Sequence, residues 1–456
     1  MRKIKEISAD TMTPISVYLR LKGKNKVILE SIPRENDQSR FSIIALNPVK
    51  HIKFTDGILS VNDEIISDEN PMEFLEKLVC QPESTDENLD LPFTNGAIGY
   101  AGFDTYGIFK GIQPELKDSI GTPDMYFMLY ESALIFDHKR EKLIFIEDNT
   151  YSQRSEKELQ NALSANIESL SLLTEAENEL TELSKLNFVS NISQELFEEK
   201  VTKAKELIRN GDMFQVVLSQ RLTADFTDNP FNYYRKLRVE NPSSYMYFME
   251  FDNFHVIGSS PERLVAVHGN QVSTNPIAGT RKRGQTEFED QALIEDLESD
   301  PKEVAEHKML VDLGRNDIGK ISKYGSIEVP IFMKVEKYRY VMHITSEVTG
   351  ELRPEFTAMD ALRATLPAGT LSGAPKHRAY QRIYEFETQK RGIYGGAIGY
   401  LTKNGNCDFA IAIRTMVLKD KKAHVQAGAG IVYDSVPEHE YQETLNKAQG
   451  LLKVGQ

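Results

Sequence analysis

Carboxylates on two predicted helices are the residues whose type and spacing best suit metal chemistry. Glu306 lies in the helical run EVAEHKML, and Glu440, Glu443 and Lys447 share one face of a helix near the end of the chain. Hard oxygen ligands from two helices suit Mg²⁺, which keeps several waters and also binds substrate oxygens. Zinc would require His or Cys, and neither an HExxH nor a CxxC pattern occurs. Because a helical carboxylate is more often plain solvated surface, these residues predict Mg²⁺ only as a hypothesis.

A turn of glycines, prolines and hydroxyl residues, Thr365–Lys376 (TLPAGTLSGAPK), leads directly into a helix-like run. Backbone N–H groups and hydroxyls at a helix N-terminus favour an anionic ligand. Such a turn more often only reverses the chain. Polar, glycine-containing turns also adjoin both glutamate helices, so together these segments predict a site for a small carboxylate-bearing substrate.

Two further side chains could serve such a site. His343 lies in an alternating, strand-like run, where a lone His is more often a packed core residue than an acid or base. Arg414 lies in the apolar strand AIAIRTMVL. An unpaired buried charge is costly, so a buried ion pair or a bound anion is the better interpretation of Arg414 than an edge position.

Length and composition limit the classes of protein that can position these residues. The chain has 456 residues, 40% of them apolar, which predicts two lobes or one large composite domain. A formal charge of −14 argues against nucleic acid or an anionic membrane as a partner. Cys80 and Cys407 lie in dissimilar contexts and support neither a disulfide framework nor a cysteine-rich metal site. No apolar run typical of a signal peptide or a membrane span occurs, and we expect a cytoplasmic protein.

The pattern of elements changes along the chain. Short β-rich runs fill the first half, including a hairpin over 133–148, and a polar stretch over 150–192 has helical spacing. We place a boundary near 190, between an N-terminal region (1–190) and a C-terminal region (191–456) that we expect to interleave. Cap signals predict helices over 193–210, from Asp300 to Gly314, and from a capping box at Ser435 to about 453. By themselves, composition and periodicity indicate only a mixed α and β fold.

One short sequence occurs twice in the chain. The residues 96–100 and 396–400 both read GAIGY. A shared strand-and-turn solution explains five identical residues better than a duplication does.

Nine ordered motifs from about residue 190 onward resemble the chorismate-utilising enzymes, most closely the large subunits of anthranilate synthases. They are FQVVLSQR (214–221), SPERL (260–264), PIAGTRKRG (276–284), EHKMLVDLGRNDIGKIS (306–322), VMHITSEVTGEL (341–352), GTLSGAPK (369–376), RGIYGGAIGYL (391–401), AIRTMV (412–417) and AGAGIVYDSVPEHEYQETLNKA (427–448). The resemblance implies an α+β fold of large antiparallel sheets packed as a sandwich with outer helices, the site lying in a cleft between them.

Three positions discriminate within this superfamily. Ala278 stands where aminodeoxychorismate synthases commonly carry a nucleophilic Lys. Gln215 stands where isochorismate and salicylate synthases carry a Lys that activates water, and a neutral Gln fits ammonia, which is already nucleophilic. His343 matches the histidine needed for the later elimination of pyruvate. All three favour the formation of anthranilate from chorismate.

The resemblance also implies a role for each site residue. Glu306 and Glu443 would hold Mg²⁺, Glu262 would protonate the departing ring hydroxyl, and His343 would assist the elimination. Thr370 would lie close to the same pocket. The residues expected to bind the carboxylates and ring oxygens of the substrate are Gly279, Thr280, Tyr394, Arg414, Gly428, Ala429 and Gly430.

Two partners follow from the same resemblance. Ser31, at the end of an LES element, and Ser244, Tyr245 and Met246 resemble the pocket through which L-tryptophan inhibits the family, although Ser244 replaces a proline often found there. Neither cysteine lies in a glycine-flanked nucleophile turn, so we expect ammonia to come from a separate glutamine amidotransferase subunit.

Two alternatives stay open. An aminodeoxychorismate synthase would make a para-aminated product, against which Ala278 and His343 argue. A catalytically silent chorismate-binding subunit would have no need for Glu262, Glu306, His343, Arg414 and Glu443 together.

Overall fold

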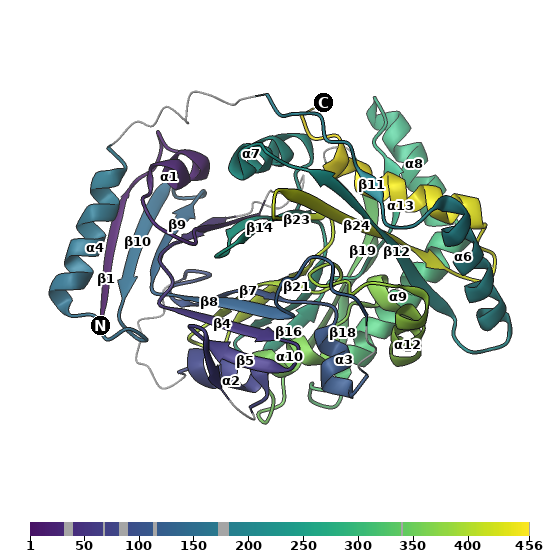
Figure 1. The fold of residues 1–456 in the computed structure, drawn as a ribbon, viewed down its shortest axis with the longest axis horizontal. Coiled ribbons are helices and arrows are strands. Elements are labelled where there is room, and N and C mark those ends of the chain that lie inside the picture. Colours follow the sequence, from purple (N-terminus) through teal and green to yellow (C-terminus); the bar gives the residue numbers. More distant parts are fainter. Residues whose placement is uncertain are drawn as a thin grey trace.

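The structure is a computed structural model, which describes residues 1–31, 40–66, 69–81, 90–112, 116–171, 182–338 and 341–455. Within these residues the chain forms two twelve-stranded sheets whose neighbouring strands pair antiparallel. In Figure 1 the two sheets pack against each other, with helices on their outer faces. The predicted α+β architecture of large packed antiparallel sheets is confirmed.

The first sheet joins strands from both ends of the chain. In spatial order it contains β1 (Arg2–Ser8), β10 (Lys142–Asp148), β9 (Ser132–Asp137), β3 (Phe41–Ala45), β2 (Val27–Glu30), β13 (Tyr245–Glu250), β14 (Phe254–Ser260), β23 (Thr415–Lys419), β24 (Lys422–Ile431), β12 (Gln215–Asp225) and β11 (Val189–Ser190), with β20 (Gly373–Ala374) beside β12.

The second sheet also combines strands that are far apart in the sequence. It contains β17 (Ile277–Lys282), β19 (Val341–Glu351), β16 (Gln271–Thr274), β15 (Arg263–His268), β22 (Cys407–Ile411), β21 (Ala397–Thr402), β7 (Gly96–Ala101), β8 (Met125–Tyr130), β4 (Lys50–Thr55), β5 (Ile58–Val61) and β6 (Glu64–Ile66), with β18 (Glu328–Lys337) beside β19. Strands from before and after residue 190 therefore share both sheets.

The described helices cover the outer faces of the sheets (Figure 1). They are α1 (Pro14–Arg20), α2 (Pro71–Val79), α3 (Thr105–Lys110), α4 (Glu156–Ser169), α6 (Gln194–Arg209), α7 (Pro230–Glu240), α8 (Glu287–Ser299), α9 (Pro301–Gly319), α10 (Ala358–Thr365), α11 (Gly369–Ser372), α12 (Lys376–Phe386) and α13 (Pro437–Leu452).

Three large apolar clusters hold these layers together. One lies between the sheets and includes Ile98, Ile135 and Tyr247. A second packs α1, α7 and α13 against the first sheet, and a third packs α2, α9 and α10 against the second sheet. Burial of apolar surface on both faces of each sheet is the main term that stabilises such a layered fold.

Most local predictions are confirmed. The hairpin over 133–148 is β9 and β10, and the helix over 193–210 is α6, capped by the side chain of Ser193 and followed by Gly211 in the left-handed region. In the polar stretch over 150–192, α4 is helical as expected, whereas residues 172–181 lie outside the described part. The two GAIGY segments pair with each other, with Gly99 opposite Gly399, so both are neighbouring strands of one sheet.

Two predicted helix ends are wrong. The side chain of Asp300 caps α9 as expected, but the helix continues through Gly314 to Gly319, because its buried face extends from Val311 to Ile318. The capping box at Ser435 does not form. Val436 is the N-cap of α13 without a side-chain cap, and the Ser435 hydroxyl instead accepts a hydrogen bond from the N–H of Val432.

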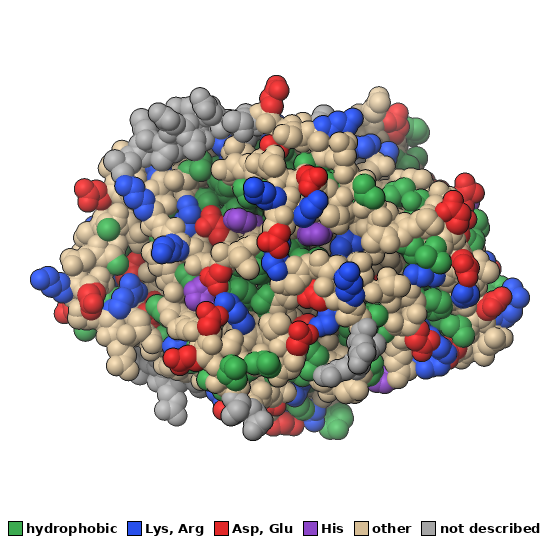
Figure 2. All heavy atoms as spheres, viewed as in Figure 1, with side chains coloured by type: hydrophobic (Ala, Val, Ile, Leu, Met, Phe, Trp, Pro, Cys, Tyr) green, Lys and Arg blue, Asp and Glu red, His purple; other side chains and the backbone are tan. Residues whose placement is uncertain are grey.

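The surface agrees with the balance of charges in the sequence. Figure 2 shows acidic and basic side chains interspersed over one face of the molecule, with no large basic patch on that face. Among the described residues, no helix has the length and apolar character that crossing a membrane requires.

Candidate active site

At two adjacent places where the chain passes from one sheet to the other, an ionisable residue lies at the crossing. Glu262 lies where β14 of the first sheet leads into β15 of the second, and Arg414 lies where β22 of the second leads into β23 of the first. Backbone hydrogen bonds join the crossings, from Ser259 N–H to the Arg414 carbonyl (3.0 Å) and from Ile411 N–H to the Glu262 carbonyl (3.0 Å). The fold therefore holds a carboxyl group and a guanidinium group close together between the sheets.

Glu262 is suited to hold a proton near neutral pH. Glu262 is 6% exposed, and burial raises the pKa of its carboxyl group to about 8. Hydrogen bonds from Ile277 N–H and from the Thr370 hydroxyl (3.4 Å), with the positive charges of Arg414 and Lys447, oppose that rise only in part. A protonated carboxyl group in this place can act as a general acid.

His343, on β19, presents one ring nitrogen as a base. Its Nδ1 lies 2.9 Å from the Gly279 carbonyl oxygen, which can only accept, so Nδ1 carries the proton. Its Nε2 is buried and has no hydrogen-bond partner among the described residues. Burial and the nearby Arg414 lower the pKa of His343 to about 4, so the ring is neutral. The Thr280 hydroxyl lies 3.0 Å from Nδ1 and helps to fix the ring.

Gly279 makes this arrangement possible. Its φ of +66° is one that glycine adopts without strain, and the pairing of β17 with β19 shifts register there. A Cβ atom at this position would lie 2.9 Å from Leu297 and 3.3 Å from a carboxylate oxygen of Glu303. The bend turns the Gly279 carbonyl toward His343.

A cluster of carboxylates lies on α9 and α13. The pKa of Glu306 is raised by burial and by the charge of Glu443, and the pKa of Glu440 is raised by burial and by the same charge of Glu443. Lys447 opposes both shifts, and its Nζ lies 2.6 Å from Glu443. A bound cation relieves the mutual repulsion among carboxylates. The predicted pair Glu306 and Glu443 therefore lies in an environment that favours cation binding.

The chemistry of this cluster fits Mg²⁺. The Gln215 side chain donates to Glu306 (3.4 Å), and its own amide oxygen is buried without a partner among the described residues. No group of three or more His, Cys, Asp or Glu side chains with metal-binding geometry occurs in the described part of the chain. Mg²⁺ needs only one or two carboxylates when water and substrate oxygens supply the remaining ligands.

Two glycines of β24 leave room beside this cluster. A Cβ atom on Gly430 would lie 2.4 Å from the Gln215 amide nitrogen, and one on Gly428 would lie 3.0 Å from the Tyr394 hydroxyl oxygen. Ala429, between them, is fully buried in the apolar cluster under α6 and α12, so only its backbone can face a ligand.

Lys447 is a central residue that the sequence did not single out as a site residue. Its Nζ donates to the Gly428 carbonyl oxygen (3.3 Å), and its charge acts on both Glu262 and Glu306. The spacing of four from Glu443 was the only signal, and it indicates an ordinary helical ion pair equally well.

The turn over Thr365–Lys376 contributes a hydroxyl group to the site. α12 begins at Lys376 without a side-chain cap, and the Lys376 side chain is buried in an ion pair with Asp317. The Thr370 hydroxyl of the short helix α11 is the group that contacts Glu262.

The four residues predicted to bind the inhibitor lie on or beside β2 and β13, two neighbouring strands in the middle of the first sheet. Glu30 pairs with Met246 across β2 and β13, which places Ser31 next to the start of β13. Ser244 is buried, and Tyr245 donates to Asp408 (2.9 Å) and accepts from Arg263 (2.8 Å).

Comparison with known proteins identifies the family of the chain. Residues 25–453 match the chorismate binding enzyme family. The chain is 99% identical over 456 residues to anthranilate synthase component 1 of Lactococcus lactis subsp. lactis (strain IL1403), with complete coverage of both chains. It is 46% identical to anthranilate synthase component 1 of Acetivibrio thermocellus, over 98% of this chain and 94% of that protein.

A solved structure shows the same arrangement of elements. The crystal structure of anthranilate synthase component I from Streptococcus pneumoniae TIGR4 superposes with a TM-score of 0.87 at 54% identity, over 98% of this chain and 99% of that one. The chain therefore belongs to the chorismate-binding enzyme family, in its anthranilate synthase component 1 group.

The carboxylate cluster generates a stability prediction. A carboxylate whose pKa is raised by folding destabilises the folded state above its ordinary pKa, so wild-type stability falls as pH rises from that value to the raised one. Glu306→Gln should therefore raise the melting temperature at pH 7 without Mg²⁺, by about 2 °C for a change on the order of 1 kcal/mol. Calorimetry checks this, with the exposed Glu298→Gln as control. A lower melting temperature for Glu306→Gln alone would contradict it.

Proposed function

We propose that this chain converts chorismate and ammonia to anthranilate and pyruvate, with Mg²⁺ at Glu306 and Glu443. The observation that carries the proposal is the juxtaposition of Glu262 and Arg414 at the sheet crossings, with the unpartnered Nε2 of His343 on β19. One site thus contains a buried acid (Glu262), a guanidinium group that can bind a substrate carboxylate (Arg414), and a base (His343).

The first step is amination of the ring. Ammonia forms a bond to ring carbon 2 while the double bonds shift and the C4–O bond breaks. Glu262 gives its proton to the departing hydroxyl, which leaves as water, and the added ammonium group loses a proton. Arg414 and Lys447 hold the substrate carboxylates through charge-assisted hydrogen bonds.

The second step is elimination of pyruvate. The proton on ring carbon 2 is removed, the bond from C3 to the enolpyruvyl oxygen breaks, and the ring becomes aromatic. The leaving group departs as the enolate of pyruvate and takes up a proton to give pyruvate. The Nε2 of His343 is the available base, held in this tautomer by the Gly279 carbonyl. The pKa of His343 is low because of burial and Arg414, and a substrate carboxylate beside Arg414 would raise it toward a useful value.

The remaining residues would hold Mg²⁺ and orient the substrate. Mg²⁺ at Glu306 and Glu443 would supply a positive charge for the ring carboxylate. The backbone at Gly428 and Gly430 and the Tyr394 hydroxyl line the place where ring substituents would lie. Gln215, a neutral side chain, cannot activate water, and this favours ammonia as the nucleophile.

A glutaminase partner and feedback inhibition by L-tryptophan complete the proposal. The relatives are named as component 1, which supports a second component that supplies ammonia. Ser31 follows β2, and Ser244, Tyr245 and Met246 lie at the start of the neighbouring strand β13, which supports a single small pocket for tryptophan at this end of the two strands.

The decisive experiment uses the purified chain with chorismate, Mg²⁺ and an ammonium salt. Anthranilate should form, because ammonia replaces the partner, and a chelator should abolish turnover. Glutamine in place of ammonium should give no product with this chain alone, and L-tryptophan should inhibit.

Other products would redirect the assignment. A para-aminated ring would indicate an aminodeoxychorismate synthase. Chorismate binding without any turnover would favour a silent subunit and contradict the proposal.

Replacement of the acid tests its role. Glu262→Gln should reduce kcat/KM by about 10² to 10⁴, the range typical of a lost general acid. In the wild type, kcat/KM should fall as pH rises through about 8, because Glu262 then loses the proton that it must donate. The variant should lose this alkaline limb, whereas the exposed Glu438→Gln should keep it. If Glu262→Gln kept the alkaline fall of kcat/KM unchanged, that fall would belong to the titration of another group.

Replacement of the base separates the two steps. His343→Gln should still consume chorismate but release pyruvate much more slowly, so that the aminated ring intermediate accumulates. Chromatography with mass detection measures the intermediate, and a coupled assay measures pyruvate. The exposed His268→Gln is the control. Equal loss of chorismate consumption and pyruvate release would show that His343 does not act in the second step alone.

A further inference from the structure

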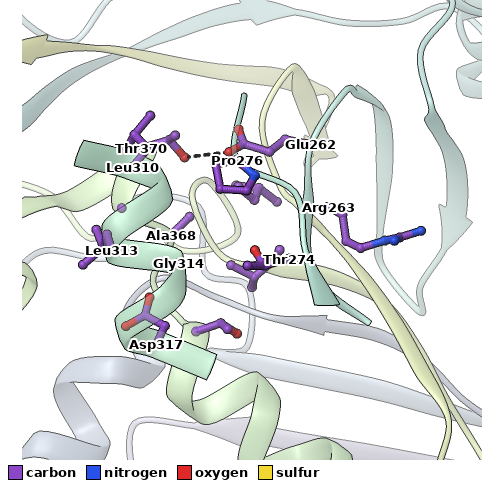
Figure 3. Close-up of a pocket in the computed structure, with 14 residues that line it drawn as sticks. Glu262, Arg263, Thr274, Pro276, Leu310, Leu313, Gly314, Asp317, Ala368 and Thr370 are labelled. Atoms are coloured by element: carbon purple, nitrogen blue, oxygen red, sulfur yellow. Dashed lines mark hydrogen bonds between the residues drawn. The ribbon is translucent and has the colours of Figure 1, made fainter. Parts of the chain in front are cut away.

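A small cavity lies behind Glu262, on the side of α9. Its volume is about 30 Å³, and its lining includes Glu262 and Thr370 at one end and Asp317 at the other. Figure 3 shows this arrangement, with Leu313 and Gly314 of α9 lying between the two ends. A water molecule requires about 10 to 15 Å³ of such space and two or more polar partners, so the cavity has room for about two waters. The hydroxyl groups of Thr274 and Thr370 and the two carboxyl groups supply the partners.

A second, larger cavity lies beside the first, on the side of the surface. Its volume is about 330 Å³, and it lies between α9 and the start of α12. Its walls include the exposed residues Asp312, Asn316 and Lys320, so it is reached from solvent. Leu313 and Asp317 line both cavities and form the junction between them.

Asp317 is fixed at this junction. It is 5% exposed, and its two carboxylate oxygens accept from Lys376 (2.5 Å) and Lys320 (3.1 Å). Lys376 also donates to the Thr365 carbonyl oxygen (2.8 Å), which ties α12 to the end of α10. A carboxylate has about four acceptor positions, so Asp317 keeps positions for water.

Gly314 keeps the small cavity beside Glu262 (the inner cavity) open, at some cost to the stability of α9. A glycine inside a helix is less favourable than alanine by roughly 0.5 to 1 kcal/mol. A Cβ atom here would lie 3.2 Å from a methyl carbon of Thr274 and 3.5 Å from Pro276, both of which line the cavity. An added side chain would therefore occupy the space between Glu262 and Asp317.

Turnover creates a need for such a space. After Glu262 has given its proton to the departing hydroxyl, its carboxylate must regain a proton before the next turnover. Glu262 is 6% exposed, and in the proposed reaction the bound substrate or product would cover it from the cleft. Water on the opposite side is the remaining source of a proton.

We propose that the two cavities form a water-filled route through which Glu262 is reprotonated from solvent between turnovers, past Asp317. A proton enters at the outer cavity, passes along hydrogen-bonded waters, and ends on the Glu262 carboxylate. The proton lost by the added ammonium group returns to solvent. One proton thus enters and one leaves per turnover, and no other reactant is needed. This inference rests on the proposed role of Glu262 as the acid.

The test fills the inner cavity and compares the first turnover with later ones. Gly314→Ala and Gly314→Val are made in the full chain, with Gly319→Ala as the matched control, since a Cβ atom there meets nothing within 4 Å. Rapid-quench assays with chorismate, Mg²⁺ and ammonium measure anthranilate per site. Glu262 begins protonated, so the first turnover should keep its wild-type rate in both variants. Later turnovers should slow, by at least about tenfold for Gly314→Val, with a larger solvent isotope effect.

Each other outcome overturns the route. A first turnover slowed as much as the later ones would mean that Gly314 acts on active-site geometry instead. Wild-type rates throughout, or slower later turnovers without a larger solvent isotope effect, would mean that protons reach Glu262 another way. If the wild type forms no anthranilate, the proposed function fails first, which is a distinguishable result. Should Gly314→Val not fold, Gly314→Ala still decides, because alanine favours the helix.

Discussion

The two adjacent crossings at Glu262 and Arg414 are the constraint on which the rest of the site depends. Two separate chain segments pass from one sheet to the other side by side, and hydrogen bonds between their backbones hold Glu262 and Arg414 together. The Arg414 backbone adopts a φ of +48°, an uncommon conformation for a residue with a side chain, and the paired crossing maintains it. Because each crossing continues into paired strands on both sides, the backbone at neither residue can move far without disrupting two sheets.

Burial at this place sets the chemistry. The same apolar surroundings raise the pKa of Glu262 to about 8 and lower the pKa of His343 to about 4, since desolvation disfavours whichever form is charged. One environment thus gives a protonated acid and a neutral base. The carboxylates of α9 and α13 lie in a different environment, where their mutual repulsion favours a cation.

The family was predictable from local pattern, and the match over residues 25–453 confirms it. The same motifs led to the prediction of Glu262, Glu306, His343, Arg414 and Glu443 as site residues. Cap signals located the start of α9 but not its end, because a buried face that extends past Gly314 outweighs the local preference of one glycine. Lys447 was not identified as a site residue, since its spacing from Glu443 is that of any surface ion pair, and only the fold brings it near Glu262.

The sequence by itself determined the residue types that chemistry requires and the family to which they belong. Tertiary structure alone decided which of them meet: Glu262 precedes Arg414 by about 150 residues, and pairing between distant strands makes them neighbours. It also decided the charge states, because a pKa depends on burial and on neighbours that come from other elements. The cavity beside Gly314 belongs to the same category, since a void is defined by the packing of several segments and leaves no pattern in any one of them.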